Sequence, residues 1–121
     1  LTPPSLSQHA ALVAMDARED LQTYAETYAR NRQLLIDALP ALGLNRIAPP
    51  DGAFYIYADI GHLTDDSLAF CHRMLAETGV ATATGRDFDP VDGGRFIRFS
   101  FAVSTEETRE AIRRLTDWFA R

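Results

Sequence analysis

One segment limits the fold of this chain more than any other: residues 95–103, with the sequence Arg-Phe-Ile-Arg-Phe-Ser-Phe-Ala-Val. In a strand, Ile97, Phe99, Phe101 and Val103 would share one face, and all four are apolar. Such a period of two is typical of a β-strand with one face in the core. The segment therefore predicts a strand in a sheet that other elements cover. Its opposite face carries Phe96, Arg98, Ser100 and Ala102.

Arg98 lies in the middle of this predicted strand, where a charged side chain needs a partner. Burying a guanidinium without one is expensive, so Arg98 either pairs with an acid of this chain, such as Asp59 or Glu107, or binds a carboxylate from outside. The planar fork of arginine suits two-point binding of a carboxylate, which lysine cannot reproduce. The pattern alone leaves both interpretations open.

The composition is that of a soluble globular protein. The chain has 121 residues, enough for one domain with a core, of which 46% are hydrophobic and 24% charged. Its net charge of -5 argues against nucleic acid or an anionic membrane as the main partner. No apolar run approaches the roughly 20 residues that span a bilayer, and the first residues lack the features of a signal peptide. The single Cys71 excludes an internal disulfide and favours a reducing, cytoplasmic location.

Two absences from the sequence indicate a part of a longer protein. The chain does not begin with methionine, and all twelve of its basic Lys and Arg positions are arginine. Chemistry that needs a lysine amine, such as an imine with a carbonyl cofactor, is therefore not completed by these residues alone.

The pattern along the chain predicts the order α-α-β-α-β-β-α, an α/β fold of α+β-like type. It consists of a small open sheet of about three strands covered by helices, preceded by two helices of which one is long. Pro40 is expected to end the long helix, Gly79 the third helix, and a Ser-x-x-Glu capping box at Ser104 begins the last one. The expected helices start at Ser5 or Ser7, span about 20–39, start near Thr64, and follow Ser104; the expected strands are 53–58, 80–83 and 95–103.

The same pattern assigns individual side chains. The third helix is expected to bury Leu68, Cys71, Met74 and Leu75, and the long helix to place Leu21, Tyr24, Tyr28 and Leu35 on one apolar stripe. Arg30, Arg32, Arg86 and Arg95 are expected to be ordinary surface charges.

Six short segments occur in an order that is informative as a series. They are Pro3-Pro4-Ser5-Leu6-Ser7-Gln8-His9-Ala10-Ala11, Tyr28-Ala29-Arg30-Asn31-Arg32, Pro50-Asp51-Gly52-Ala53-Phe54-Tyr55, Gly79-Val80-Ala81, Gly85-Arg86-Asp87-Phe88 and Arg98-Phe99-Ser100-Phe101-Ala102. The series resembles the C-terminal part of class I/II, fold-type I aminotransferases that use pyridoxal 5'-phosphate. The resemblance covers essentially the whole chain.

The resemblance implies a domain organisation and a site. Residues 1–19 would be a remnant of the large domain, residues 20–40 a long interdomain helix, and residues 41–121 the C-terminal small domain. Arg98 would hold the α-carboxylate of an amino acid or 2-oxo acid substrate, and Gly52, Phe54 and Tyr55 would lie along the substrate channel. No catalytic, cofactor-binding or metal-binding residue is expected within the chain.

The resemblance also implies partners that these residues do not supply. The cofactor pyridoxal 5'-phosphate, its imine-forming lysine and its phosphate site would belong to a preceding large domain, and a homodimer partner would share the active site. The chain alone is therefore expected to be inactive and not to bind the cofactor.

Two positions depart from the pattern of that family. Thr84 stands where the family commonly has proline before the glycine of the Gly85 loop, and Asp89 where a glycine often follows the phenylalanine. Both departures fall in a loop, so we expect an altered local shape rather than a loss of function.

Alternatives to this assignment remain at the level of sequence. Aromatic residues are favoured in strands, so Phe54, Tyr55 and Tyr57 are more typical of a sheet core than of substrate contacts. Cys71 and His72 point about 100° apart on a helix, which is poor geometry for one metal ion. A small α+β domain also fits a non-catalytic amino-acid-binding module, or the effector-sensing, aminotransferase-like part of a transcription regulator.

Overall fold

The computed structural model describes residues 2–121, in which four α-helices accompany a three-stranded sheet. This arrangement confirms the predicted fold class. The elements are α1 (Ser5–Ala14), α2 (Arg18–Ala38), β1 (Tyr55–Asp59), α3 (Ser67–Thr78), β2 (Ala83–Thr84), β3 (Phe96–Ser100) and α4 (Thr105–Phe119), with the 3-10 turns η1 (Leu39–Leu42), η2 (Gly85–Asp87) and η3 (Gly93–Arg95).

The sheet is antiparallel, in the order β1-β3-β2, and the Arg98 segment is its central strand. Arg98 lies opposite Tyr57 of β1 on one side and Ala83 of β2 on the other. The predicted strand at 80–83 is wrong for its first three residues. Residues 80–82 do not pair with β3, and Val80, Ala81 and Phe99 help to line a groove of about 520 Å³.

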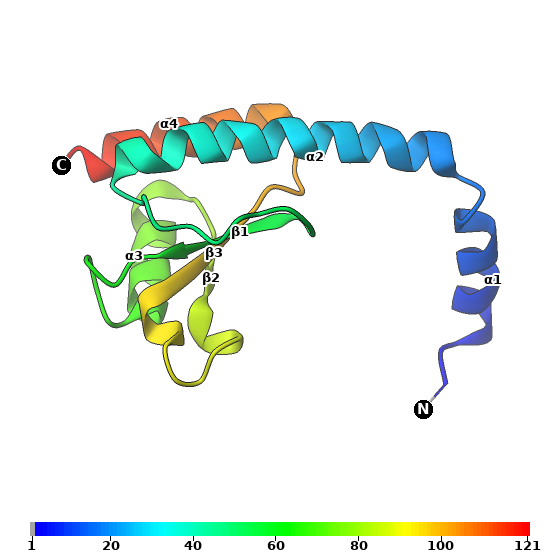
Figure 1. The fold of residues 1–121 in the computed structure, drawn as a ribbon, viewed down its shortest axis with the longest axis horizontal. Coiled ribbons are helices and arrows are strands. Elements are labelled where there is room, and N and C mark those ends of the chain that lie inside the picture. Colours follow the sequence, from blue (N-terminus) through cyan, green and yellow to red (C-terminus); the bar gives the residue numbers. More distant parts are fainter. Residues whose placement is uncertain (1) are drawn as a thin grey trace.

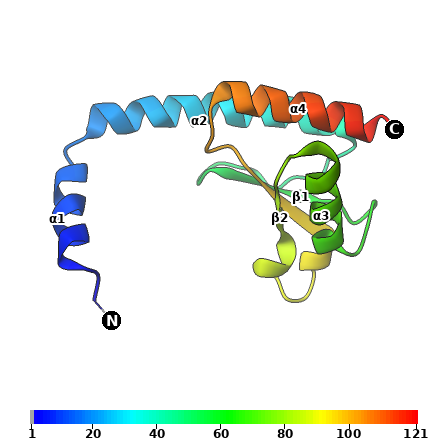
Figure 2. The same cartoon turned by 180° about the vertical axis from the view of Figure 1, so that it is seen from behind.

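Helices α2, α3 and α4 cover one face of the sheet, so the alternation in β3 separates a core face from a site face. Ile97 and Phe99 are buried, whereas Phe96 and Arg98 are half-buried. In Figures 1 and 2, α2 and α4 lie side by side over the sheet, and α3 packs beneath them. The core beneath these helices consists of Leu35, Leu39, Leu42, Leu44, Ile56, Ala58, Ile60, Phe70, Cys71, Met74, Ile97, Phe99, Phe101 and Leu115.

Only the second half of α2 belongs to this core. Asn31 is fully buried, and its side-chain amide donates to the carbonyl oxygens of Phe101 (3.2 Å) and Val103 (2.8 Å), which fixes α2 to the end of the central strand. The first half of α2 and all of α1 extend away from the sheet (Figure 1), and the predicted apolar stripe is wrong for Leu21 and Tyr24, which are 56% and 61% exposed. No described residue covers these two side chains.

Helix α3 begins three residues later than predicted because Asp66 is its cap. The Asp66 carboxylate accepts a hydrogen bond from Ala69 N at 3.2 Å, and Gly79 ends the helix in the left-handed region (φ 73°), as predicted. The predicted apolar face is wrong for Leu68 and Leu75, which are exposed. The face that is buried consists of Ser67, Phe70, Cys71 and Met74.

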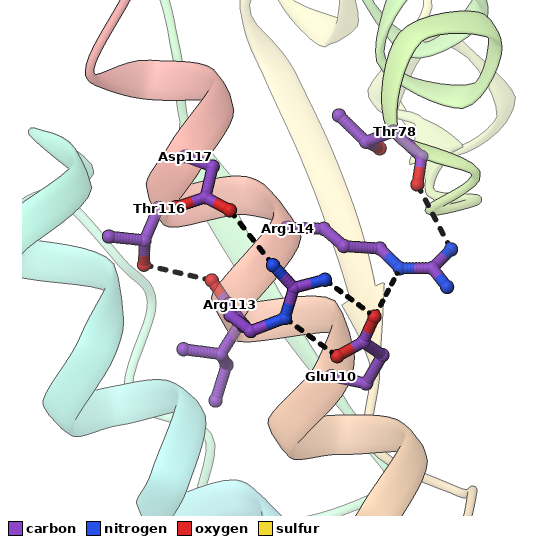
Figure 3. A network of polar contacts seen from close by, with 7 residues as sticks. Thr78, Glu110, Arg113, Arg114, Thr116 and Asp117 are labelled. Atoms are coloured by element: carbon purple, nitrogen blue, oxygen red, sulfur yellow. Dashed lines mark hydrogen bonds and ion pairs between the residues drawn. The ribbon is translucent and has the colours of Figure 1, made fainter.

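Helix α4 has the predicted capping box, with Ser104 and Glu107 bonded to each other's backbone N–H. Figure 3 shows the polar network on its exposed side, in which Glu110 accepts hydrogen bonds at 2.8 Å from both Arg113 and Arg114. These donors lower the pKa of Glu110 to about 2. Arg114 also donates to the carbonyl of Thr78 (3.2 Å), which connects α4 to α3. No helix within residues 2–121 has both the length and the apolar character that a membrane span requires.

Candidate functional site

Arg98 occupies a pocket of about 320 Å³ on the sheet face opposite the helices. Its guanidinium carbon lies 4.9 Å from the ring centre of Tyr55 and 4.5 Å from that of Phe88. Tyr55 comes from β1, and Phe88 comes from the loop after β2, so the rings reach Arg98 from the two strands that flank β3. The pocket is lined by Tyr55, Tyr57, Phe88, Asp89 and Arg98.

The interpretation that Arg98 pairs with an acid of this chain is wrong for the part that the structure describes. Asp59 binds Arg95 and Arg46, and Glu107 caps α4 through Ser104; within residues 2–121 neither these acids nor any other forms an ion pair with Arg98. Aromatic faces stabilise a cation without using its N–H groups. The donors of Arg98 therefore stay available to a ligand.

Asp89 lines the same pocket but is engaged by its own loop. Its Oδ1 accepts the backbone N–H groups of Val91 (2.9 Å) and Asp92 (3.1 Å). This is the side-chain-to-backbone turn that aspartate favours. The departure from the family pattern at position 89 thus fixes the loop that carries Phe88.

Thr84, the other departure, has a comparable role. Its hydroxyl lies 2.6 Å from that of Ser67, and Ser67 Oγ also lies 2.8 Å from the carbonyl of Gly93, to which it donates. Because Ser67 has a single hydroxyl hydrogen, Thr84 is the donor between the two side chains. The Thr84 oxygen in turn accepts the N–H of Arg86 at 3.2 Å. Ser67 of α3 thus bonds both to Thr84, at the start of the loop, and to Gly93, near its end.

Arg95 is not the ordinary surface charge that the sequence predicts. Its Nε and Nη2 donate to Oδ1 (3.3 Å) and Oδ2 (2.8 Å) of Asp59, a carboxylate with 5% side-chain exposure. Gly61 N donates to Oδ1 at 2.8 Å, and Arg46 Nη1 lies 3.2 Å from Oδ2. Burial alone would raise the pKa of Asp59, but the Gly61 N–H and the two guanidinium groups outweigh it and hold this pKa below its usual value.

Tyr57 lies beside Arg98 with a buried hydroxyl. Its ring stacks on Phe96, with ring centres 4.9 Å apart and planes 9° from parallel. The hydroxyl has no hydrogen-bond partner among the described residues and lies close to Gly85, where an added Cβ would approach it to 2.6 Å. Burial, together with the nearby Asp89, raises the pKa of Tyr57.

Removing this hydroxyl is expected to stabilise the fold. Tyr57→Phe keeps the ring stack and deletes a buried polar atom without a partner, so the free energy of unfolding should rise by about 1 kcal/mol. Because the folded pKa is raised, the wild type loses stability as the pH rises above about 10, whereas the variant has no group to titrate at this position. Urea unfolding at pH 7 and at pH 10.5 measures both effects, and a less stable variant at pH 7 would show that the hydroxyl is satisfied.

The other predicted site residues lie outside the pocket. Phe54 is 46% exposed and meets Tyr55 edge-on, with ring centres 5.8 Å apart. A Cβ built on Gly52 would meet nothing within 4 Å, so no described residue requires glycine there. The left-handed residue of this turn is instead Ala53 (φ 57°), a conformation that costs about 1 kcal/mol for a residue with a Cβ.

Cys71 and His72 do not contribute to the pocket. The Cys71 thiol is buried and accepts a hydrogen bond from Thr82 Oγ1 at 3.2 Å, while His72 is exposed. Burial raises the pKa of the Cys71 thiol, which keeps it protonated at neutral pH. Residues 2–121 contain no group of three or more side chains placed to hold a metal ion.

Sequence reasoning missed Phe88 and Asp89 as parts of the site. Phe88 stands in the Gly-Arg-Asp-Phe segment, and its 54% exposure is unusual for a large aromatic side chain. The motif could have drawn attention to it, but only the folded loop places its ring over Arg98.

The fold and the pocket together define a small α/β domain with an arginine that pairs with no carboxylate of residues 2–121. A model of the family "Aminotransferase class I and II" matches residues 1–115. The chain therefore belongs to the class I and II aminotransferases.

Relatives support this membership in sequence and in structure. The chain is 49% identical to a valine–pyruvate aminotransferase of Mycobacterium tuberculosis, over 98% of this chain and 31% of that protein. It is 35% identical to an aspartate/prephenate aminotransferase of Thermus thermophilus, over 93% of this chain and 29% of that protein. A crystal structure of an aminotransferase from Mycobacterium tuberculosis superposes with a TM-score of 0.91 at 49% identity, over 98% of this chain and 31% of that one. The chain thus spans about a third of the length of these relatives.

Proposed function

We propose that this chain is the C-terminal portion of a pyridoxal-phosphate-dependent aminotransferase, in which Arg98 binds the α-carboxylate of the amino acid or 2-oxo acid substrate. The observation that carries the proposal is the guanidinium of Arg98, held by two aromatic rings in a pocket and unpaired with any described acid. A carboxylate is the ligand that matches its fork of donors.

Binding the carboxylate at two points restricts rotation of the substrate. A substrate fixed in this way keeps the bonds at its α-carbon in one orientation, which is how positioning accelerates a reaction. The role of this chain is therefore to bind and orient, and the half-buried site strengthens the charge pairing relative to water. The turn that precedes the pocket residue Tyr55 contains Gly52, the strained Ala53 and Phe54. We propose that this turn borders the substrate channel.

The residues of this chain do not fit the cofactor itself. Pyridoxal 5'-phosphate supplies the carbonyl and the electron sink of transamination, and its attachment needs a lysine, which the sequence lacks. We propose that the cofactor site lies in the remaining two thirds of the length that relatives have.

The exposed helices support the same division of the protein. Helix α1 has no buried residue, and its apolar side chains, like those of the first half of α2, face outward. We propose that residues 1–19 belong to the large domain, that residues 20–40 connect the domains, and that residues 41–121 form the small domain. The apolar residues that the large domain or a partner subunit would cover are Leu6, Leu12, Val13, Met15, Leu21 and Tyr24.

An activity assay of the longer protein tests the proposal. With pyridoxal 5'-phosphate, amino acids and 2-oxo acids, the longer protein should transfer amino groups, whereas the 121 residues alone should neither do so nor change the cofactor's absorbance. Failure of the longer protein with every amino acid would overturn the proposed activity. Micromolar binding of an amino acid to the 121 residues alone would favour a regulatory binding module instead.

A further inference from the structure

Phe88 is a large apolar side chain in an unusual setting. It is 54% exposed, yet its ring lies 4.5 Å from the guanidinium carbon of Arg98, closer than the ring of Tyr55. Hydrophobic burial gives little reason for an aromatic residue at an exposed loop position. Its contact with the one arginine that lines this pocket does give a reason.

The loop that carries Phe88 is fixed at many points. The N–H groups of Phe88 and Asp89 both bond to the carbonyl of Gly85, at 3.0 and 2.9 Å. Gly85 and Gly93 touch so closely that a Cβ on Gly93 would lie 2.5 Å from the Gly85 oxygen. Together with the bonds made by Ser67, Thr84 and Asp89, these contacts hold Phe88 in one place.

A fixed ring stabilises Arg98 differently from a fixed acid. An acid would occupy N–H donors of the guanidinium and compete with a ligand for its charge. A ring face attracts the cation and restricts its motion, but leaves its donors unoccupied. Arg95, the last residue of η3 before the same strand, shows the contrast, because its Nε and Nη2 both donate to Asp59.

We infer that Phe88 is a positioning residue, whose ring, with that of Tyr55, holds the Arg98 guanidinium ready for an incoming carboxylate. The inference rests on the proposed function of Arg98 and adds a residue that does not itself touch the carboxylate. Phe88 acts through Arg98, so its effect should disappear when Arg98 is absent.

Substitutions at position 88 in the longer protein test this role. Phe88→Leu keeps an apolar side chain of similar size but has no ring face, so KM for the amino acid should rise about 3- to 30-fold. The kcat value should change less than the KM value. Phe88→Tyr keeps the ring and should stay within about twofold of the wild type. The matched control is Val91→Ala, in the same loop, where Val91 is 85% exposed and lines no part of the pocket.

A double-mutant cycle separates this inference from the proposed function. In an Arg98→Ala background, Phe88→Leu should have no further effect on kcat/KM. An equal loss in both backgrounds, or a Phe88→Leu variant with wild-type kinetics, would overturn the positioning role and leave the function of Arg98 intact. An Arg98→Ala variant with wild-type kinetics would instead contradict the proposed function itself. Equal thermal unfolding midpoints of the single variants show that the fold is retained.

Discussion

Replacing Arg98 with alanine in the longer protein should lower kcat/KM by an amount that corresponds to a loss of about 3–5 kcal/mol of transition-state stabilisation. This is the range for removing one partner of a desolvated charge pair. The size follows from the setting of Arg98, which is half-buried and has no described acid to pair with. The substrate carboxylate would lose its cation and its two-point orientation together. Steady-state kinetics with the preferred amino acid measures the change.

Two further variants make this expectation specific. Arg98→Lys keeps the charge but not the planar fork, so it should recover only part of the lost kcat/KM. Arg46→Ala removes an arginine with 77% side-chain exposure whose Asp59 partner is also held by Arg95. Arg46 lines no part of the Arg98 pocket, so this variant should leave kcat/KM within about twofold of the wild type. An Arg98→Ala variant with near-normal kinetics would exclude carboxylate binding by Arg98.

The features that the sequence predicted well are those that depend on neighbouring residues. The capping box at Ser104 and the left-handed Gly79 are decided within one helical turn, and both occur as predicted. The predicted alternation of buried and less buried residues is also observed in residues 96–100, because a strand buried on one face must keep its period of two.

The features that the sequence missed depend on distant partners. Arg95 pairs with Asp59, 36 positions away, and Arg32 donates to the carbonyl of Pro50 at 2.8 Å, 18 positions away. Neither pairing leaves a local pattern, so both arginines resembled surface charges. The exposed stripe of α2 was missed for another reason, since the sequence shows that a face is apolar but not what covers it.

The candidate site likewise contains one feature that depends on its own segment and one that depends on distant residues. The sequence indicates Arg98 as a candidate, because a charge in the middle of an apolar strand needs an explanation. The ring of Phe88 was not, because its place depends on how Gly85, Gly93 and Ser67 close a loop between two strands. The sequence motifs therefore indicate Arg98 as a candidate, and only the fold shows which rings contact it.

Asp59 should be the acid whose removal destabilises this fold most. Its carboxylate accepts three hydrogen bonds and also pairs with Arg46, and Asp59→Ala would leave Arg95, with 42% side-chain exposure, without its two bonds. Breaking a buried ion pair typically costs about 3–5 kcal/mol, and hydration of the two exposed arginines should reduce this to about 2–3 kcal/mol. Urea unfolding of the 121-residue chain at pH 7 measures the loss.

Glu110 provides the matched control, and acid provides the electrostatic test. Glu110 also binds two arginines, but its side chain is 44% exposed, so Glu110→Gln should change stability far less than Asp59→Ala.

The pKa of Asp59 is lowered in the folded state. Its contribution is therefore complete above the unfolded value of about 3.8 and is lost as the pH falls through the lower, folded value. The stability difference between the wild type and Asp59→Ala should shrink as the pH falls below about 3.8, and a difference that stays constant with pH would mean that Asp59 acts through packing rather than charge.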